Sequence, residues 1–449
     1  MVRRLVNKIK SNRFVTATLK VGSGQLISQI ISVITVPVLS RIYADTAYGD
    51  AALITSTAAV IIDFAILSLN SAIMKPEKIE EARKVFTTAF LLNALVATIL
   101  STVCLMFQRQ FSLFAVSKDY GTAILLMWLY IITFATNSLM TVYMNKQGKY
   151  NKLFFNPIIG SGAQVLLAIP LGLLGFGYKG FLITYITSNT IAVAHMMWKN
   201  NPFYRGYRFH HLLEVVKTYK DYILYQCPSN FISTSAIEYP TQYLGRCFTT
   251  QQLGGYSLCV RVMKYPIRLI AAPISTVYFR TATEYHREGK NLAAFTYKMI
   301  SWVLLISAVP VGVFIVTSKP LFAFVLGESW REAGSLASFL VIQYVMMFCS
   351  QTTSYCRVSL GRQKVNLLVT SVNLIVSIGS CIVGYALFRS MEGTVFCYSL
   401  GQCIYGICDM AVNFYIMDKK YLWRYLGIST AYTGLMFAVL IFSRYVPGL

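Results

Sequence analysis

Three cationic side chains lie inside one long, mostly apolar stretch of the sequence. Arg261, Lys264 and Arg268 are spaced three and four residues apart within residues 255 to 278. On a helix of 3.6 residues per turn, they lie within roughly 60° of one another. Such a stripe can hold an anionic group by charge and hydrogen bonding. The chemistry that it predicts is therefore binding.

These charges are costly if the stretch crosses a membrane. A central Arg or Lys costs about 2.5 to 3.5 kcal/mol on insertion scales, so three on one stripe should face a wet or protein-lined site. Arg268 lies near the centre of the stretch, and Pro266 and Pro273 should interrupt the helix around it. The alternative is that the span begins later and the cations reach outward to the interface.

Three further arginines lie at predicted span ends. Arg41 and Arg246 follow the first and seventh spans. They could contact a substrate, or pair with helix C-terminal carbonyls or a lipid head group. Arg357, at the inner end of the tenth span, is predicted to be a surface anchor on the cytoplasmic side, with substrate binding as the alternative.

Three carboxylates lie within the apolar stretches: Asp63, Glu238 and Asp409. An acidic side chain inside a membrane usually binds a coupling ion or proton, or neutralises a buried cation. We expect one of these two roles for each carboxylate. The sequence does not reveal which ion would be coupled.

The elements that position these residues are thirteen stretches of about twenty mostly apolar residues, the length needed to cross a bilayer as a helix. The predicted spans are residues 20–42, 51–73, 85–107, 121–143, 153–175, 179–198, 223–245, 255–278, 298–318, 335–358, 367–388, 394–416 and 427–443. The last is the shortest. The sequence therefore predicts an all-α polytopic membrane protein.

Lysine and arginine set the predicted orientation of these spans. With the N-terminus inside and the residues at span ends counted with the adjoining loop, 27 of the 40 Lys and Arg residues lie in cytoplasmic segments, nine lie outside and four lie within spans. This asymmetry follows the positive-inside rule. The net charge of +23 then faces anionic lipid head groups, so nucleic acid is not an expected partner.

Composition argues against an enzyme. The chain has four His and ten scattered Cys without a C-x-x-C motif, so neither a metal site nor another cofactor is predicted. The longest predicted loops are Lys319 to Gly334 outside and Lys199 to Tyr222 inside, both too short to fold as domains. No catalytic residue is assigned.

The sequence also contains an apparent internal repeat. Arg41 to Gly49 aligns with Arg246 to Gly254 at an offset of 205 residues, and Lys146-Gln147 corresponds to Arg362-Gln363 six spans later. A six-helix repeat predicts two bundles in the same orientation, related by a pseudo-two-fold axis around a central cavity. The predicted division is a bundle at 1–198, a cytoplasmic linker at 199–222, a bundle at 223–416, and a turn with a possible extra span at 417–449.

Several short motifs resemble those of a known family. They are Pro37 to Tyr43 with Tyr48-Gly49, Asn145 to Lys149, Gly177 to Gly180, Leu253 to Leu258 with Arg261 and Pro266, Gly327 to Gly334, and Gly361 to Leu367. In order and spacing, they are similar to polysaccharide-unit flippases of the multidrug/oligosaccharidyl-lipid/polysaccharide exporter superfamily. The similarity covers about residues 15 to 420. The family usually has twelve spans, so the thirteenth is a departure.

The resemblance implies alternating access between two bundles in a bacterial inner membrane. The implied substrate is an undecaprenyl-pyrophosphate-linked O-antigen or capsule repeat unit, whose diphosphate needs cations along its path. A coupling proton or sodium ion, membrane lipids and other polysaccharide-assembly proteins are the expected partners. The alternatives are a multidrug-type exporter of the same superfamily, or a glycan-assembly enzyme such as a polymerase.

Overall fold

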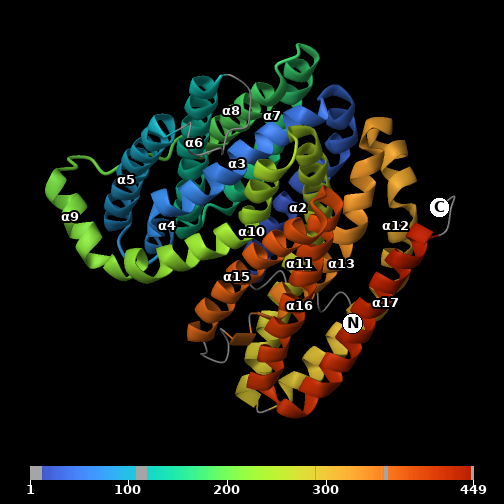
Figure 1. Ribbon diagram of the computed structural model, residues 1–449. Helices are drawn as coiled ribbons and strands as arrows, with labels where there is room; N and C mark the ends of the chain where they lie inside the picture. The colour runs from blue at the N-terminus through green and yellow to red at the C-terminus, as the bar shows by residue number, and fades with distance from the viewer. Residues whose placement is uncertain (1–12, 108–118, 289, 355, 358–362, 446–449) are drawn as a thin grey trace. The chain divides into compact units, whose positions relative to one another are not determined.

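The computed structural model describes residues 13–107, 119–288, 290–354, 356–357 and 363–445 (Figure 1). The regular elements in these residues are all helices, which satisfy the backbone hydrogen bonds locally, as a hydrocarbon environment requires. All thirteen predicted spans coincide with helices. The prediction of an all-α polytopic membrane protein is confirmed.

The chain divides into two compact units, Met1–Thr234 and Ser235–Leu449. The first contains α2 (Arg13–Ile42), α3 (Asp45–Ile66), α4 (Leu69–Ala72), α5 (Ile79–Met106), α6 (Tyr120–Lys146), α7 (Tyr150–Leu173), α8 (Gly177–Met197), α9 (Phe209–Thr218) and the π-helix η2 (Tyr222–Gln226). The boundary lies within α10 (Cys227–Cys247). The second continues with α11 (Thr250–Glu288), α12 (Leu292–Leu326), η3 (Glu328–Trp330), α13 (Arg331–Thr353), α15 (Gln363–Phe388), α16 (Met391–Met417) and α17 (Lys419–Tyr445).

This division differs from the predicted one because the linker packs onto the first unit. The phenol of Tyr207 lies 2.6 Å from the Thr88 hydroxyl on α5, and the Tyr204 backbone N–H donates to Thr87 at 3.0 Å. Residues 199–222 therefore belong with the first unit, and they contain α9 rather than an extended loop. The thirteenth helix belongs with the second unit.

Within the part of the chain that the structure describes, ten helices are long and apolar enough to cross a membrane: α2 from Lys20, α3, α5, α6, α7, α12, η3 with α13, α15, α16 and α17. Of the thirteen predicted spans, those on α8, α10 and α11 are not in this set. Each of the three carries polar or charged side chains along its length. In a bilayer, such helices need protein or water around their polar faces.

Three predicted boundaries were wrong. The external loop from Lys319 to Gly334 does not exist, because α12 continues to Leu326 and η3 follows at Glu328. The second span is divided at Leu67 and Ser68, which both have left-handed backbone angles (φ 52° and 55°). The thirteenth span is not short, since α17 has 27 residues.

The helix ends agree with the internal repeat. α2 ends at Ile42 and α3 begins at Asp45, while α10 ends at Cys247 and α11 begins at Thr250. Both pairs are 205 residues apart, the offset of the sequence match. Arg362, in the second match, lies outside the described residues.

Tyr43 explains two of the family-like motifs through packing. Its ring stacks on Phe181 of α8 at 4.1 Å, and its hydroxyl donates to the Ala168 carbonyl of α7 at 2.7 Å. A Cβ at Gly172 would lie 2.5 Å from a ring carbon of Tyr43, and a Cβ at Gly180 would lie 2.9 Å from its hydroxyl oxygen. The glycines thus make room for a tyrosine that joins α2 to α7 and α8.

Candidate functional site

The predicted cationic stripe lies on α11. Arg261 and Lys264 are partly buried there, whereas the Arg268 side chain lies outside the described part of the structure. The helix continues through Pro266 and Pro273, so the expected interruption was wrong. A proline in a long helix removes one hydrogen bond and bends the helix without ending it. The stripe as a binding site stays a prediction.

The depth of the stripe is not fixed by the helix. With 39 residues, α11 is about 58 Å long at 1.5 Å per residue, far more than a hydrocarbon core of about 30 Å. Arg41 and Arg246 are exposed in the last turns of α2 and α10, and Glu238 is partly buried in α10. Their roles in substrate or ion binding also stay predictions.

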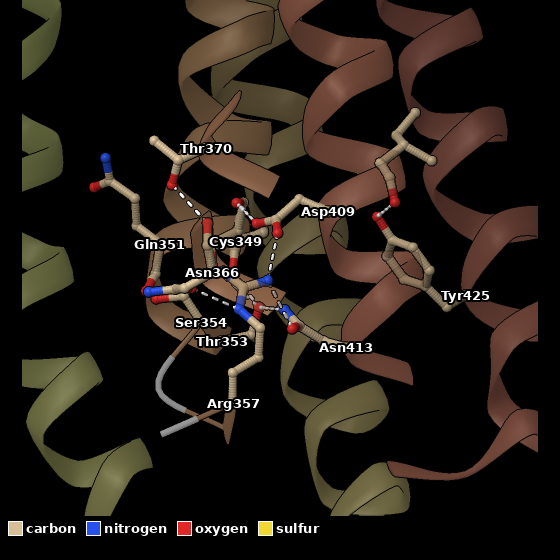
Figure 2. Close-up of polar contacts among 12 residues, drawn as sticks. Cys349, Gln351, Thr353, Ser354, Arg357, Asn366, Thr370, Asp409, Asn413 and Tyr425 are labelled. Atoms are coloured by element: carbon tan, nitrogen blue, oxygen red, sulfur yellow. Dashed lines mark hydrogen bonds and ion pairs between the residues drawn. The ribbon is translucent and has the colours of Figure 1, made fainter. Parts of the chain in front are cut away.

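The second unit contains a buried ion pair that joins three helices. The Arg357 guanidinium pairs with the Asp409 carboxylate, and the two side chains are 4% and 2% exposed. Arg357 Nη1 also donates to Asn413 Oδ1 at 3.0 Å, and its Nε donates to Asn366 Oδ1 at 2.9 Å (Figure 2). Arg357 follows α13, Asn366 lies on α15, and the other two partners lie on α16.

Hydroxyl groups complete this network. Ser350 Oγ donates to the second oxygen of Asp409, and Asn413 Nδ2 donates to Thr353 Oγ1 at 3.3 Å (Figure 2). Both charges are therefore compensated inside the protein. The predicted surface anchor at Arg357 was wrong, because the side chain turns into the helix bundle toward Asp409. The sequence alone did not reveal this pair, because its two partners are 52 residues apart.

Asp63 lies near the break between α3 and α4 in the first unit. Its carboxylate accepts a hydrogen bond from Thr234 on α10, and its side chain is partly buried. Beside it, Asn230 Nδ2 donates to Ser68 Oγ at 3.2 Å. The start of α10 is therefore held against an interrupted membrane helix through polar contacts, an arrangement often found at ion sites in transporters.

Lysines on either side of the turn between α6 and α7 bond to backbone carbonyls of neighbouring segments. Lys146 Nζ donates to the carbonyls of Met74 and Pro76 beyond α4. Lys152 Nζ donates to the His195 and Met196 carbonyls at the end of α8, both at 3.0 Å. A cation at a helix C-terminus neutralises unpaired carbonyls and the helix dipole. Lys146 of the Asn145 to Lys149 motif and Lys152 just after it therefore have structural contacts.

A further motif residue makes a surface ion pair. Lys179 Nζ lies 2.6 Å from Asp119 Oδ2, just before α6. The hydrogen bond from Lys179 is the main cause that lowers the pKa of Asp119 from its ordinary value, and the hydroxyl of Thr122 adds to it. Both side chains are substantially exposed, so the pair contributes little to stability.

These arrangements offer charge compensation and hydrogen bonding. Among the described residues, no group of three or more His, Cys, Asp or Glu could hold a metal ion. The ten cysteines are free, and six of them are buried.

A family model described as "Polysaccharide biosynthesis protein" matches residues 38–335. A comparison with curated protein sequences finds no match.

Solved structures of similar fold are membrane transporters. The lipid II flippase MurJ, in an inward closed conformation, aligns with a TM-score of 0.68 and 12% identity over 96% of this chain and 99% of that chain. An inward-facing multidrug resistance MATE family transporter of the MOP superfamily aligns with a TM-score of 0.66 and 15% identity over 89% of this chain and 96% of that chain. A MOP superfamily transporter from Pyrococcus furiosus aligns with a TM-score of 0.59 and 14% identity over 90% of this chain and 96% of that chain. At these identities, the likeness concerns the fold.

Proposed function

We propose that this chain, which belongs to the polysaccharide biosynthesis protein family, is a flippase for a lipid-linked glycan repeat unit. The family match over residues 38–335 carries the proposal. The transporter fold supports it, because a polysaccharide-assembly protein with this fold is suited to moving a precursor across the membrane.

The proposed cargo is an undecaprenyl-pyrophosphate-linked O-antigen or capsule unit. It would pass by alternating access from the cytoplasmic to the external leaflet of a bacterial inner membrane. The diphosphate cannot enter hydrocarbon without compensating cations. Arg261, Lys264 and Arg268 on α11 are the proposed ligands, with Arg41 and Arg246 as further contacts.

The test is the leaflet in which the glycolipid resides. Cells that lack the chain should accumulate the repeat unit facing the cytoplasm, shown by protection from an impermeant labelling reagent. Arg268→Glu and Arg261→Glu should reproduce this, because a reversed charge repels the diphosphate. Arg331→Glu is the matched control, since Arg331 pairs with Glu328 at an exposed site. Normal labelling in the deletion strain, with no redundant exporter, would refute the flippase.

A coupling cation, a proton or sodium, is the second part of the proposal. Asp63 is the favoured carboxylate because the interrupted helix and the Thr234 contact surround it with polar groups, while Glu238 is a further candidate. In contrast, Asp409 already neutralises Arg357. Asp63→Asn should abolish the dependence of transport on an imposed ion gradient in proteoliposomes. Gradient-driven transport at the wild-type rate would exclude Asp63.

The runner-up function is multidrug export, favoured by the fold of the MATE transporter. A cationic drug would be repelled by the α11 cations, so charge reversal at Arg261 and Arg268 should spare or improve export. The same variants therefore separate the two functions. A polymerase differs again, because its loss would stop glycan elongation while flipping continues.

A further inference from the structure

Three asparagines from three helices form a hydrogen-bonded chain within the first unit. Asn156 Nδ2 on α7 donates to Asn137 Oδ1 on α6 at 3.2 Å, and Asn137 Nδ2 donates to Asn189 Oδ1 on α8 at 3.1 Å. Asn189 Nδ2 then donates to the Tyr185 carbonyl at 2.9 Å. Because each asparagine donates to the next group, the carboxamide oxygen of the first asparagine receives no hydrogen bond from this series.

That acceptor is Asn156 Oδ1, which is buried and has no protein partner. The side chain is 8% exposed. A buried carboxamide oxygen without a donor costs about 1 to 3 kcal/mol. The site therefore calls for a hydrogen-bond donor that the protein does not supply.

The same helices present uncharged polar faces. On α6, Tyr130, Phe134, Asn137 and Thr141 lie along one side and are partly or fully exposed, whereas Leu125 is 55% exposed on the opposite side. On α8, Asn189 and Tyr185 lie opposite the exposed Ile191. Exposed aliphatic side chains face lipid most cheaply, so the polar side of each helix faces water.

Helix α2 repeats this pattern. Gln25, Ser28, Gln29 and Ser32 follow one side of the helix. The other side carries Ile27, Ile30, Ile34 and Val38, each at least 40% exposed. Gln25 is exposed, and the Oε1 atom of Gln29 is buried without a partner. Asn137 and Asn189 lie more than two turns from either end of their helices.

We infer that these carboxamides, Gln25 and Gln29 on α2 and Asn137, Asn156 and Asn189 on the neighbouring helices α6, α7 and α8, bind the uncharged sugar rings of the cargo together with Tyr130 and Tyr185. Carboxamides offer donors and acceptors together, as sugar hydroxyls require. Asn156 Oδ1 is buried in this structure, so a sugar hydroxyl would supply its missing donor in a conformation in which the helices open around it. The Tyr130 and Tyr185 rings, 6.0 Å apart, offer flat surfaces beside the amides. The inference rests on the proposed function, and it separates glycan binding in the first unit from diphosphate binding on α11.

The experiment compares two probes on the full chain in nanodiscs. One is the glycolipid extracted from cells that lack this chain, and the other is undecaprenyl diphosphate without sugar. Asn189→Leu and Gln25→Leu should each weaken glycolipid binding roughly three- to tenfold, the value of one or two hydrogen bonds, and leave binding of the sugar-free lipid unchanged. Gln25→Leu removes no helix-to-helix bond among those described, so it tests binding if Asn189→Leu unfolds.

Thr102→Leu is the matched control, because Thr102 is exposed on α5 and bonds to its own helix through the Thr98 carbonyl at 2.8 Å. It should change neither affinity. Equal weakening of both probes, or no change in either, overturns the inference. If the wild-type chain binds neither probe, the flippase proposal itself fails.

Discussion

At the scale of single residues, the buried pair of Arg357 and Asp409 shows how this protein keeps charge inside a bundle. Each charge is neutralised by the other, and the remaining polar atoms bond to Ser350, Asn366 and Asn413. Replacing such a pair by apolar residues is often nearly neutral, whereas removing one partner is severe. The pair therefore fixes which side chains meet, more than it adds net stability.

Asp409→Leu should destabilise the second unit by about 3 to 5 kcal/mol, because Arg357 is left buried without a counter-charge. The double variant Arg357→Met with Asp409→Leu should recover most of this loss. Chemical unfolding in detergent measures both, in a double-mutant cycle with Arg357→Met alone. Additive effects of the two substitutions would show that the ion pair is not coupled in solution.

The sequence predicted the residues of this site better than their partners. Asp409 stood out because a carboxylate in an apolar stretch is rare, and one of its two expected roles was a buried ion pair. Its partner could not be identified, because the pairing depends on how α13 and α16 pack. Arg357 follows α13 at the inner end of a span, where a surface anchor is the usual role for arginine.

At the scale of helices, Gly24 allows α2 to pack closely on the backbone of α7. A Cβ at Gly24 would lie 2.2 Å from the backbone oxygen of Phe154, so the two helices would have to move apart. Gly22, one half-turn earlier, has no such neighbour within 4 Å. The two positions form a matched pair within the same helix.

Gly24→Ala should lower stability by about 1 to 3 kcal/mol through overpacking. Gly22→Ala should leave stability unchanged or raise it by up to about 1 kcal/mol, because alanine favours a helix. Thermal unfolding of the two variants in the same detergent measures the difference. Equal melting temperatures would mean that α2 and α7 are not packed this closely.

Helix positions were predictable because apolar length is a local property of the sequence. Helix ends were less so. Lys319 and Pro320 looked like the start of a loop, yet α12 passes through both and ends at Leu326. The break at Leu67 and Ser68 was also hidden, since neither is a glycine and left-handed angles are unusual for both. Contacts with α10, far along the chain, accompany that break.

At the scale of the whole molecule, the predicted thirteen spans would place the two chain ends on opposite sides of the membrane. α17 packs into the second unit, where Arg444 pairs with Glu392 at 3.1 Å and donates to Ser335 at 2.7 Å. Met391, next to Glu392, begins α16, and Ser335 lies near the start of α13, so these contacts join helix ends of the same side. Helix α17 therefore runs antiparallel to α16, as the predicted thirteenth span requires.

Alkaline phosphatase, which is active only outside the cytoplasm, tests this topology. Fused after Asp418 it should be inactive, and fused after Arg444 it should be active. A matched fusion after Phe388, at the external end of α15, should be active as well. Activity after Asp418 would reverse the proposed orientation, and inactivity after Arg444 would mean that α17 does not cross.

The Arg357 and Asp409 pair also has a consequence for biogenesis. Ribosomes make Arg357 52 residues before Asp409, so the cation is in place when α16 reaches the membrane. An aspartate at the centre of an isolated span opposes insertion by about 2.5 to 3.5 kcal/mol. Arg357 is therefore already available to neutralise Asp409 when α16 inserts. The order of synthesis thus favours assembly of this helix pair.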